Sequence, residues 1–188
     1  MRIPDDEAPE ILATRRWLER AVIGLDLCPF ARGVHQGRRI RYVLSGANSP
    51  EALLEDLARE LLFLRDADPL ECETTLLVHP GVFGDFLDFN DFLDAVDGAV
   101  EELGLEGELQ VASFHPDYQF AGTEPDDIGN FTNRSPYPTL HLLRESSIER
   151  AVESHPDIDG IPDRNIRTMR ALGIEGWRRL WLDDPQGG

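Results

Sequence analysis

The stretch Thr74–Pro80, TTLLVHP, is a short apolar run with β-branched residues that stops at a His-Pro pair. These features predict a strand over residues 74–78. A second run, Leu109–Phe114, predicts another strand and stops in the same way at His115-Pro116. Proline restricts the residue before it to extended backbone and cannot continue a hydrogen-bonded ladder. Each histidine is therefore predicted to be the last ordered residue of its strand.

Helical patterns alternate with these strands. Apolar spacing, caps and breakers predict a strand at 39–44, a loop at 28–37, and helices at 9–27, 50–67, 89–103, 139–154 and 162–172. Such alternation favours right-handed crossovers between parallel strands. We expect one α/β domain over residues 9–182, with flexible tails at 1–8 and 183–188. Its sheet should be small, three- to four-stranded and mostly parallel, flanked by helices and followed by a C-terminal helical extension.

The composition limits the classes of function. The 188 residues carry 36 acidic and 18 basic side chains, a net charge of −18, and every basic residue is Arg because Lys is absent. The absence of Lys excludes a Schiff-base lysine, and the acidic field opposes nucleic acid and anionic membranes as partners. A small-molecule ligand fits this charge better. Two separated cysteines and no signal-peptide or membrane-spanning pattern predict a cytoplasmic protein.

Three histidines could form a site at the carboxyl ends of the strands. If the two strands are parallel neighbours, His79 and His115 lie about 5 Å apart in the sheet direction and can reach one atom. His141 is expected in the first turn of the helix at 139–154, with Arg144 on the same face. The three imidazoles would then act as acid/base groups or hold a divalent transition metal such as Zn or Fe. Alternatively, each imidazole only hydrogen-bonds loop backbone.

Other candidates lie in the loops. Residues 117–137 show no period, and a loop of this length is usually functional or mobile. The side chains that we expect to bind substrate are Tyr118, Asn133, Arg134 and Arg144. Cys28 offers thiol chemistry if it caps a helix opened by Pro29, but it is disfavoured as a thiolate if it trails the first helix.

Several segments together resemble one bacterial family. They are WLERAVIGLDLCPFA, TTLLVHP, DFNDFLDAVD, QVASFHPDYQFAGT, NFTNRSPYPTLHLLRESSIERAV and IPDRNI, which span about Thr14 to Trp177. The family is filed as domain of unknown function 1415. The resemblance implies a single-domain bacterial protein and supplies no activity, cofactor or catalytic residue.

Three functions are therefore compatible with the sequence. The first is an enzyme that uses His79, His115 and His141 for metal-assisted hydrolysis or oxidation of a small anionic substrate. The second is a non-enzymatic module that binds a small metabolite or a protein partner. The third is an enzyme that uses the thiol of Cys28, which requires this side chain to open onto the same pocket.

Overall fold

The protein forms a four-stranded sheet with helices on both faces, and the computed structural model describes residues 8–154 and 159–181. The strands are β1 (Ile40–Leu44), β2 (Thr74–Val78), β3 (Leu109–Phe114) and β4 (Thr139–Arg144). The helices are α1 (Pro9–Trp17), which continues into the π-helical segment η2 (Leu18–Ile23), α2 (Ala31–Gln36), α3 (Pro50–Asp66), α4 (Phe86–Glu102), the 3-10 helix η3 (Ile128–Asn133), α5 (Glu145–Ser154) and α6 (Ile161–Arg179). The tails predicted at 1–8 and 183–188 lie outside the described residues, apart from Ala8, which is buried.

The local signals in the sequence act as expected at several boundaries. The side chain of Ser49 accepts a hydrogen bond from the backbone N–H of Ala52 and caps α3, with Pro50 in the first turn. Gly173 interrupts α6 with a positive φ of 65°. The predicted strands β1, β2 and β3 are confirmed, whereas the loop predicted at 28–37 is wrong in part because α2 forms there.

The helix predicted at 139–154 is wrong over its first six residues. Residues 139–144 form β4, and only α5 is helical. β4 lies between β2 and β3 and runs antiparallel to both, so that His141 pairs with Leu76 on one side and Ala112 on the other. The pairing satisfies backbone groups on both sides of β4, and this tertiary gain outweighs the helical spacing of apolar residues.

The sheet order is β1-β2-β4-β3. The α/β class and the four strands agree with the prediction, but "mostly parallel" is wrong because β1 and β2 form a parallel pair and the other two pairs are antiparallel. The strands β2 and β3 still run in the same direction. However, β4 separates them, so they are not the neighbours that the sequence suggested.

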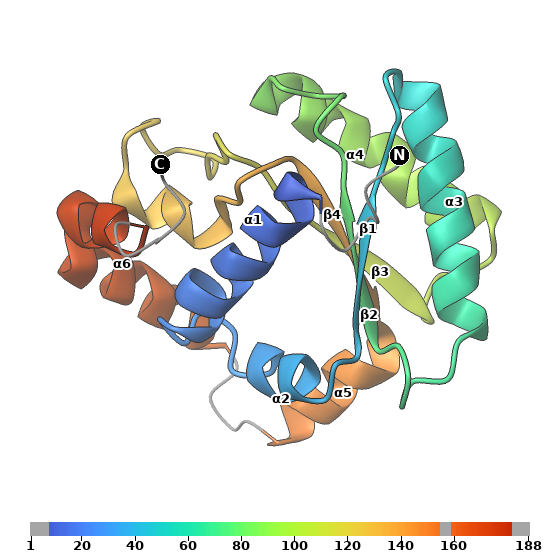
Figure 1. The fold of residues 1–188 in the computed structure, drawn as a ribbon, viewed down its shortest axis with the longest axis horizontal. Coiled ribbons are helices and arrows are strands. Elements are labelled where there is room, and N and C mark those ends of the chain that lie inside the picture. Colours follow the sequence, from blue (N-terminus) through green and yellow to red (C-terminus); the bar gives the residue numbers. More distant parts are fainter. Residues whose placement is uncertain (1–7, 155–158, 182–188) are drawn as a thin grey trace.

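The two faces of the sheet are covered by different helices. Figure 1 shows α3 and α4 on one side of the sheet and α1 and α2 on the other. The larger core lies under α3 and α4 and includes Leu57, Leu61, Phe89, Leu140 and Leu142. A smaller cluster around Trp17 lies on the opposite face. Within residues 8–154 and 159–181, no helix combines the length and apolar character that crossing a membrane requires.

Arg144 was predicted to bind substrate, but in the structure its side chain holds parts of the fold together. It is the last residue of β4 and only 7% exposed. Its Nη2 donates hydrogen bonds to the backbone carbonyls of Leu64, Ala67 and Cys72. The guanidinium therefore ties the end of α3 and the following loop to the sheet. Because Arg144 is in a strand, the predicted helical face shared with His141 does not exist.

We predict that Arg144→Met destabilises the fold by about 3 kcal/mol, because three backbone carbonyls, two of them buried, lose their donor. Chemical denaturation of the native protein and the variant measures this difference. Arg65→Met is the matched control, since Arg65 is exposed and pairs with its neighbour Asp66, and the variant should unfold like the native protein. Equal stability of all three proteins would contradict the role given to Arg144.

Candidate functional site

Strand alternation separates the three candidate histidines. Leu140 and Leu142 of β4 point into the core under α3 and α4, so His141 between them points to the opposite face. His79 and His115, in contrast, both contact the ring of Phe89 from α4, with centroid distances of 5.3 Å and 5.4 Å. The pair and His141 therefore lie on opposite faces of the sheet.

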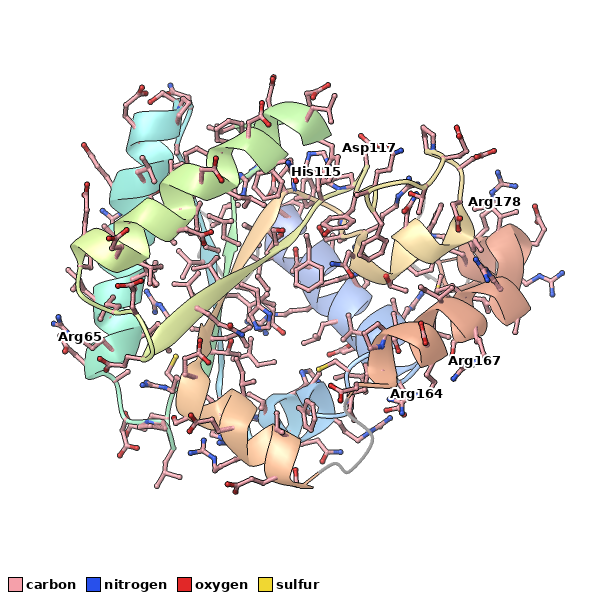
Figure 2. The ribbon with its side chains drawn as sticks, turned by 180° about the vertical axis from the view of Figure 1, so that it is seen from behind. Arg65, His115, Asp117, Arg164, Arg167 and Arg178 are labelled. Atoms are coloured by element: carbon pink, nitrogen blue, oxygen red, sulfur yellow. The ribbon has the colours of Figure 1, made fainter. Side chains whose placement is uncertain are left out.

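His115 organises the loop at its end of the sheet. Its Nε2 donates to the carbonyl of Phe83 at 2.9 Å, and its Nδ1 accepts from the backbone N–H of Asp117 at 3.0 Å. Both ring nitrogens are occupied by backbone groups, which fixes the tautomer. Phe83 has a positive φ of 60°, and this hydrogen bond holds its carbonyl in place. Figure 2 shows His115 and Asp117 together at this end of the sheet.

His79 is fully buried beside the same aromatic ring. Its Nδ1 lies 3.3 Å from the carbonyl of Val82, while Nε2 has no hydrogen-bond partner in the part of the chain that the structure describes. Burial lowers the pKa of His79 to about 4, and the nearby His115 acts in the same direction. His79 is neutral at pH 7 and packs as part of the core.

The geometry does not support the predicted three-histidine metal centre. Among the described residues, no three His, Cys, Asp or Glu side chains are grouped so that they could hold a metal ion. His79 and His115 instead match the alternative in which each imidazole hydrogen-bonds loop backbone. The sequence identified their common edge but not the β4 strand that places His141 on the far face.

His141 lines a cavity on the face of the sheet covered by α1, α2 and α5. The cavity has a volume of about 350 Å³, and Cys28 also lines it. Its walls are mainly apolar and include Trp17, Val22, Leu76, Ala112, Phe114 and Ile148. Protein interiors rarely contain voids much larger than a water molecule, so a cavity of this size is a candidate ligand site.

The hydrogen bonds of Thr74 fix the tautomer of His141. The hydroxyl of Thr74 donates its one hydrogen to the carbonyl of Leu142 at 2.6 Å, so Nε2 of His141 must donate to that hydroxyl oxygen at 2.8 Å. Nδ1 then carries a lone pair, and no described group hydrogen-bonds it. Burial lowers the pKa of His141 to about 4. His141, which lines the cavity, thus has a neutral hydrogen-bond acceptor that no described group occupies.

Cys28 lies between η2 and α2 and is not activated. Burial raises the pKa of its thiol, and the backbone N–H groups of Phe30 and Ala31 oppose this shift with a smaller effect. The side chain is therefore a neutral thiol at pH 7. Cys72, the other cysteine, is buried and lies 3.7 Å from the carbonyl of Thr74.

A more polar pocket of about 400 Å³ lies along β3, next to the cavity. The two share Val22, Cys28, Ala112 and Phe114 as lining residues. Two predicted substrate-binding residues, Tyr118 and Asn133, line this β3-edge pocket together with Cys28. Burial raises the pKa of the Tyr118 phenol, and a hydrogen bond with Asn133 partly offsets the shift.

Arg134 occupies a different position from the other predicted substrate-binding residues. Its Nε donates to the carbonyl of Tyr118 at 3.2 Å, Nη2 donates to Pro125, and the guanidinium lies 4.2 Å from the centre of the Phe131 ring. It lines neither the cavity nor the β3-edge pocket.

Sequence reasoning missed most of the apolar wall and the hydroxyl that orients His141. Thr74 was recognised only as a strand residue, and Trp17 only as part of a helix. The one available signal was Ala112, a small residue at an alternating strand position that leaves space beside its neighbours.

Comparison with known proteins supplies a family and no activity. A family model described as "Protein of unknown function (DUF1415)" matches residues 10–179, nearly the whole chain. Neither the curated proteins nor the solved structures gave a match.

We predict that stability falls as the pH falls from about 6.5 to 4. In this window the unfolded chain protonates its imidazoles, while His79 and His141 stay neutral in the fold, so the unfolded state binds more protons. For each of the two histidines, lowering the pKa from 6.5 to about 4 contributes about 3 kcal/mol. Denaturation at a series of pH values measures the loss.

Because 36 carboxyl side chains also titrate, the informative comparison is with His141→Gln, which keeps a donor for Thr74. The loss of stability across the window should be smaller by about 3 kcal/mol in this variant. A pH dependence identical to that of the native protein would show that His141 is not held neutral.

Proposed function

We propose that this chain, which belongs to the DUF1415 family, binds a small, uncharged and largely apolar molecule that carries one hydrogen-bond donor. The observation that carries the proposal is the apolar cavity of about 350 Å³ that His141 lines, together with the Nδ1 of this residue, which has no hydrogen-bond partner among the described residues. The apolar part of the ligand would occupy the cavity. Its donor would bind Nδ1.

The size of the cavity supports a ligand of one or two rings. An apolar cavity of about 150 Å³ suffices to bind benzene. The cavity beside His141 is more than twice that volume. Transfer of apolar ligand surface from water contributes roughly 25 cal/mol per Å², so even a bicyclic molecule can bind measurably.

The charge state of the wall supports an uncharged ligand. His141 and Cys28 are both neutral at pH 7 for the reasons given above. Glu73 also lines the cavity, but its carboxylate is paired with Arg39 and lies 3.7 Å from Arg150. A charged ligand would lose its hydration without gaining an ionic partner.

The same observations favour binding over thiol catalysis. Cys28 meets the geometric condition for the thiol hypothesis, because it lines the cavity together with His141. However, a thiol with a pKa above its ordinary value of about 8.5 would have to transfer its proton to an imidazole with a pKa of about 4. Because the pKa of the thiol is raised and that of the imidazole is lowered, the proton stays on sulfur and the thiolate is scarce.

Metal-assisted hydrolysis or oxidation gains less support. It depended on three converging imidazoles, and His141 lies on the face of the sheet opposite to His79 and His115. We therefore favour binding over catalysis. We also propose that the protein is cytoplasmic. Its proposed partner is a small molecule and not nucleic acid, in line with the net charge of −18.

We predict that 1-naphthol binds roughly fivefold more tightly than naphthalene, because only 1-naphthol can donate a hydrogen bond to Nδ1 of His141. Dissociation constants from calorimetry or fluorescence measure the ratio. In His141→Leu the ratio should fall to about one. Ala112→Leu should abolish binding of both molecules, since Ala112 lies opposite His141 in the β3–β4 register and its enlarged side chain would fill the cavity.

Ala121→Leu is the matched control for Ala112→Leu. Ala121 is exposed and lines neither the cavity nor the β3-edge pocket, so the same chemical change there should leave binding intact. The proposal fails if neither molecule binds the native protein, or if Ala112→Leu is folded and binds both as well as the native protein does.

We also predict that iodoacetamide modifies Cys28 slowly at pH 7 and about tenfold faster for each pH unit up to about pH 9, because burial raises the pKa of the thiol. Mass spectrometry assigns the site, and Cys28→Ser gives the background from Cys72. Saturating 1-naphthol should slow the reaction. Rapid modification with a plateau below pH 7 would identify an activated thiol and favour thiol chemistry.

A further inference from the structure

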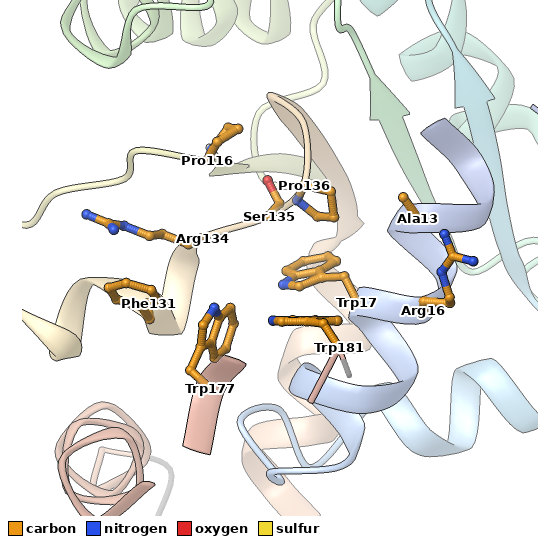
Figure 3. A pocket seen from close by; sticks show the side chains of 10 residues that line it. All are labelled: Ala13, Arg16, Trp17, Pro116, Phe131, Arg134, Ser135, Pro136, Trp177 and Trp181. Carbon is orange, nitrogen blue, oxygen red and sulfur yellow. The ribbon is translucent and has the colours of Figure 1, made fainter. Parts of the chain in front are cut away.

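A third pocket, of about 430 Å³, lies between α1, α6 and residues 131–136, and it is lined by aromatic rings. All three tryptophans of the chain, Trp17, Trp177 and Trp181, line it, together with Phe131. Figure 3 shows these rings gathered from separate elements, with Arg134 and Arg16 on opposite sides of the group. We call it the tryptophan pocket.

The aromatic rings are fixed by contacts with one another. Trp177 meets Phe131 edge to face at 5.3 Å and Trp181 at 5.4 Å between ring centres. Trp17 packs edge to face on Phe114 at 5.0 Å. Rings held in this way offer surfaces for a planar ligand at little entropic cost.

The described charged residues that line the tryptophan pocket are both positive. They are Arg16 and Arg134, and no Asp or Glu within residues 8–154 and 159–181 lines it, although the chain has 36 acidic and 18 basic residues. The neighbouring pocket, which has a volume of about 780 Å³ and is also lined by Arg134, differs in charge because Asp85, Asp117 and Asp126 line it.

Arg134 is held in position without a carboxylate partner. Two backbone carbonyls accept its hydrogen bonds, its guanidinium covers the Phe131 ring, and no described carboxylate forms an ion pair with it. Burial lowers its pKa, as expected for a partly desolvated cation. A pre-positioned guanidinium next to aromatic surfaces matches an anionic group attached to a planar ring.

We infer that the tryptophan pocket binds a small planar aromatic anion, with the ring against the tryptophans and the carboxylate or phosphate at Arg134. The site is distinct from the cavity of the proposed function, since Trp17 is the one described residue that lines both. The ligand class also differs, because the cavity takes an uncharged molecule.

The test titrates the native protein with four probes and follows tryptophan fluorescence, since every tryptophan of the chain lines the pocket. Benzoate and phenyl phosphate carry both a ring and an anion, benzyl alcohol lacks the charge, and cyclohexanecarboxylate lacks the aromatic ring. We expect at least one of the two aromatic anions to bind about tenfold more tightly than either of the other probes. Which of the two binds more tightly distinguishes a carboxylate ligand from a phosphate ligand.

Two variants with the same change in charge locate the anion. Arg134→Gln should weaken binding of the better aromatic anion about tenfold. Arg167 is an exposed residue of α6 that does not line the pocket (Figure 2), so Arg167→Gln should leave binding of this anion unchanged. Trp177→Leu should weaken binding of the aromatic anion about fivefold and have little effect on binding of cyclohexanecarboxylate.

The inference is overturned if benzyl alcohol or cyclohexanecarboxylate binds as tightly as both aromatic anions, a comparison that needs no variant to fold. It is also overturned if Arg134→Gln and Arg167→Gln, both folded by circular dichroism, weaken binding equally. The variant Ala112→Leu, in which the cavity is filled, should still bind the aromatic anion in the tryptophan pocket. Loss of 1-naphthol binding alone would therefore count against the proposed function and not against the tryptophan pocket.

Discussion

The insertion of β4 between β2 and β3 is the constraint on which the rest of this structure depends. Side chains of a strand alternate between the two faces of a sheet, so the register of β4 decides that Leu140 and Leu142 join the core under α3 and α4. The same register sends His141 to the other face. A slip of one residue would bury the imidazole in the main core and move two leucines toward the cavity.

The two faces of the sheet consequently have different physical properties. Under α3 and α4 the core is continuous, and the buried His79 and His115 pack around Phe89 as parts of it. The opposite face is covered by α1, α2 and α5, and their side chains leave a cavity that His141 lines. A cavity costs packing energy, because the atoms around it lose contacts. That cost is consistent with a face shaped for a ligand, as the proposed function states.

The electrostatic character of the pockets differs from that of the whole chain. The chain has a net charge of −18, yet the cavity is lined by a neutral imidazole, a neutral thiol and a carboxylate, Glu73, that is paired with Arg39. Among the described charged residues, only arginines line the tryptophan pocket. Such local departures from the average charge select ligands, because a buried polar group needs a matching partner. The net charge alone therefore describes the solvent-exposed surface better than it describes the sites.

The sequence by itself determined the elements whose signals are local. Ser49-Pro50 fixed the start of α3, Gly173 interrupted α6, and the His-Pro pairs fixed the ends of β2 and β3 at one edge of the sheet. These predictions succeeded because caps, breakers and strand ends depend on only a few neighbouring residues. The site candidates Cys28, Tyr118 and Asn133 line pockets, and their roles in catalysis or substrate binding stay predictions.

Only the tertiary structure decided that residues 139–144 form a strand, that His141 is separated from the other two histidines, and that Arg144 holds the end of α3. The apolar spacing of that segment fits a helix as well as a strand. The choice was made by two strand edges, β2 and β3, which supply hydrogen-bond partners from residues far away in the chain. Pairing of that kind leaves no local pattern, and the cavity that follows from it could not be predicted from the sequence.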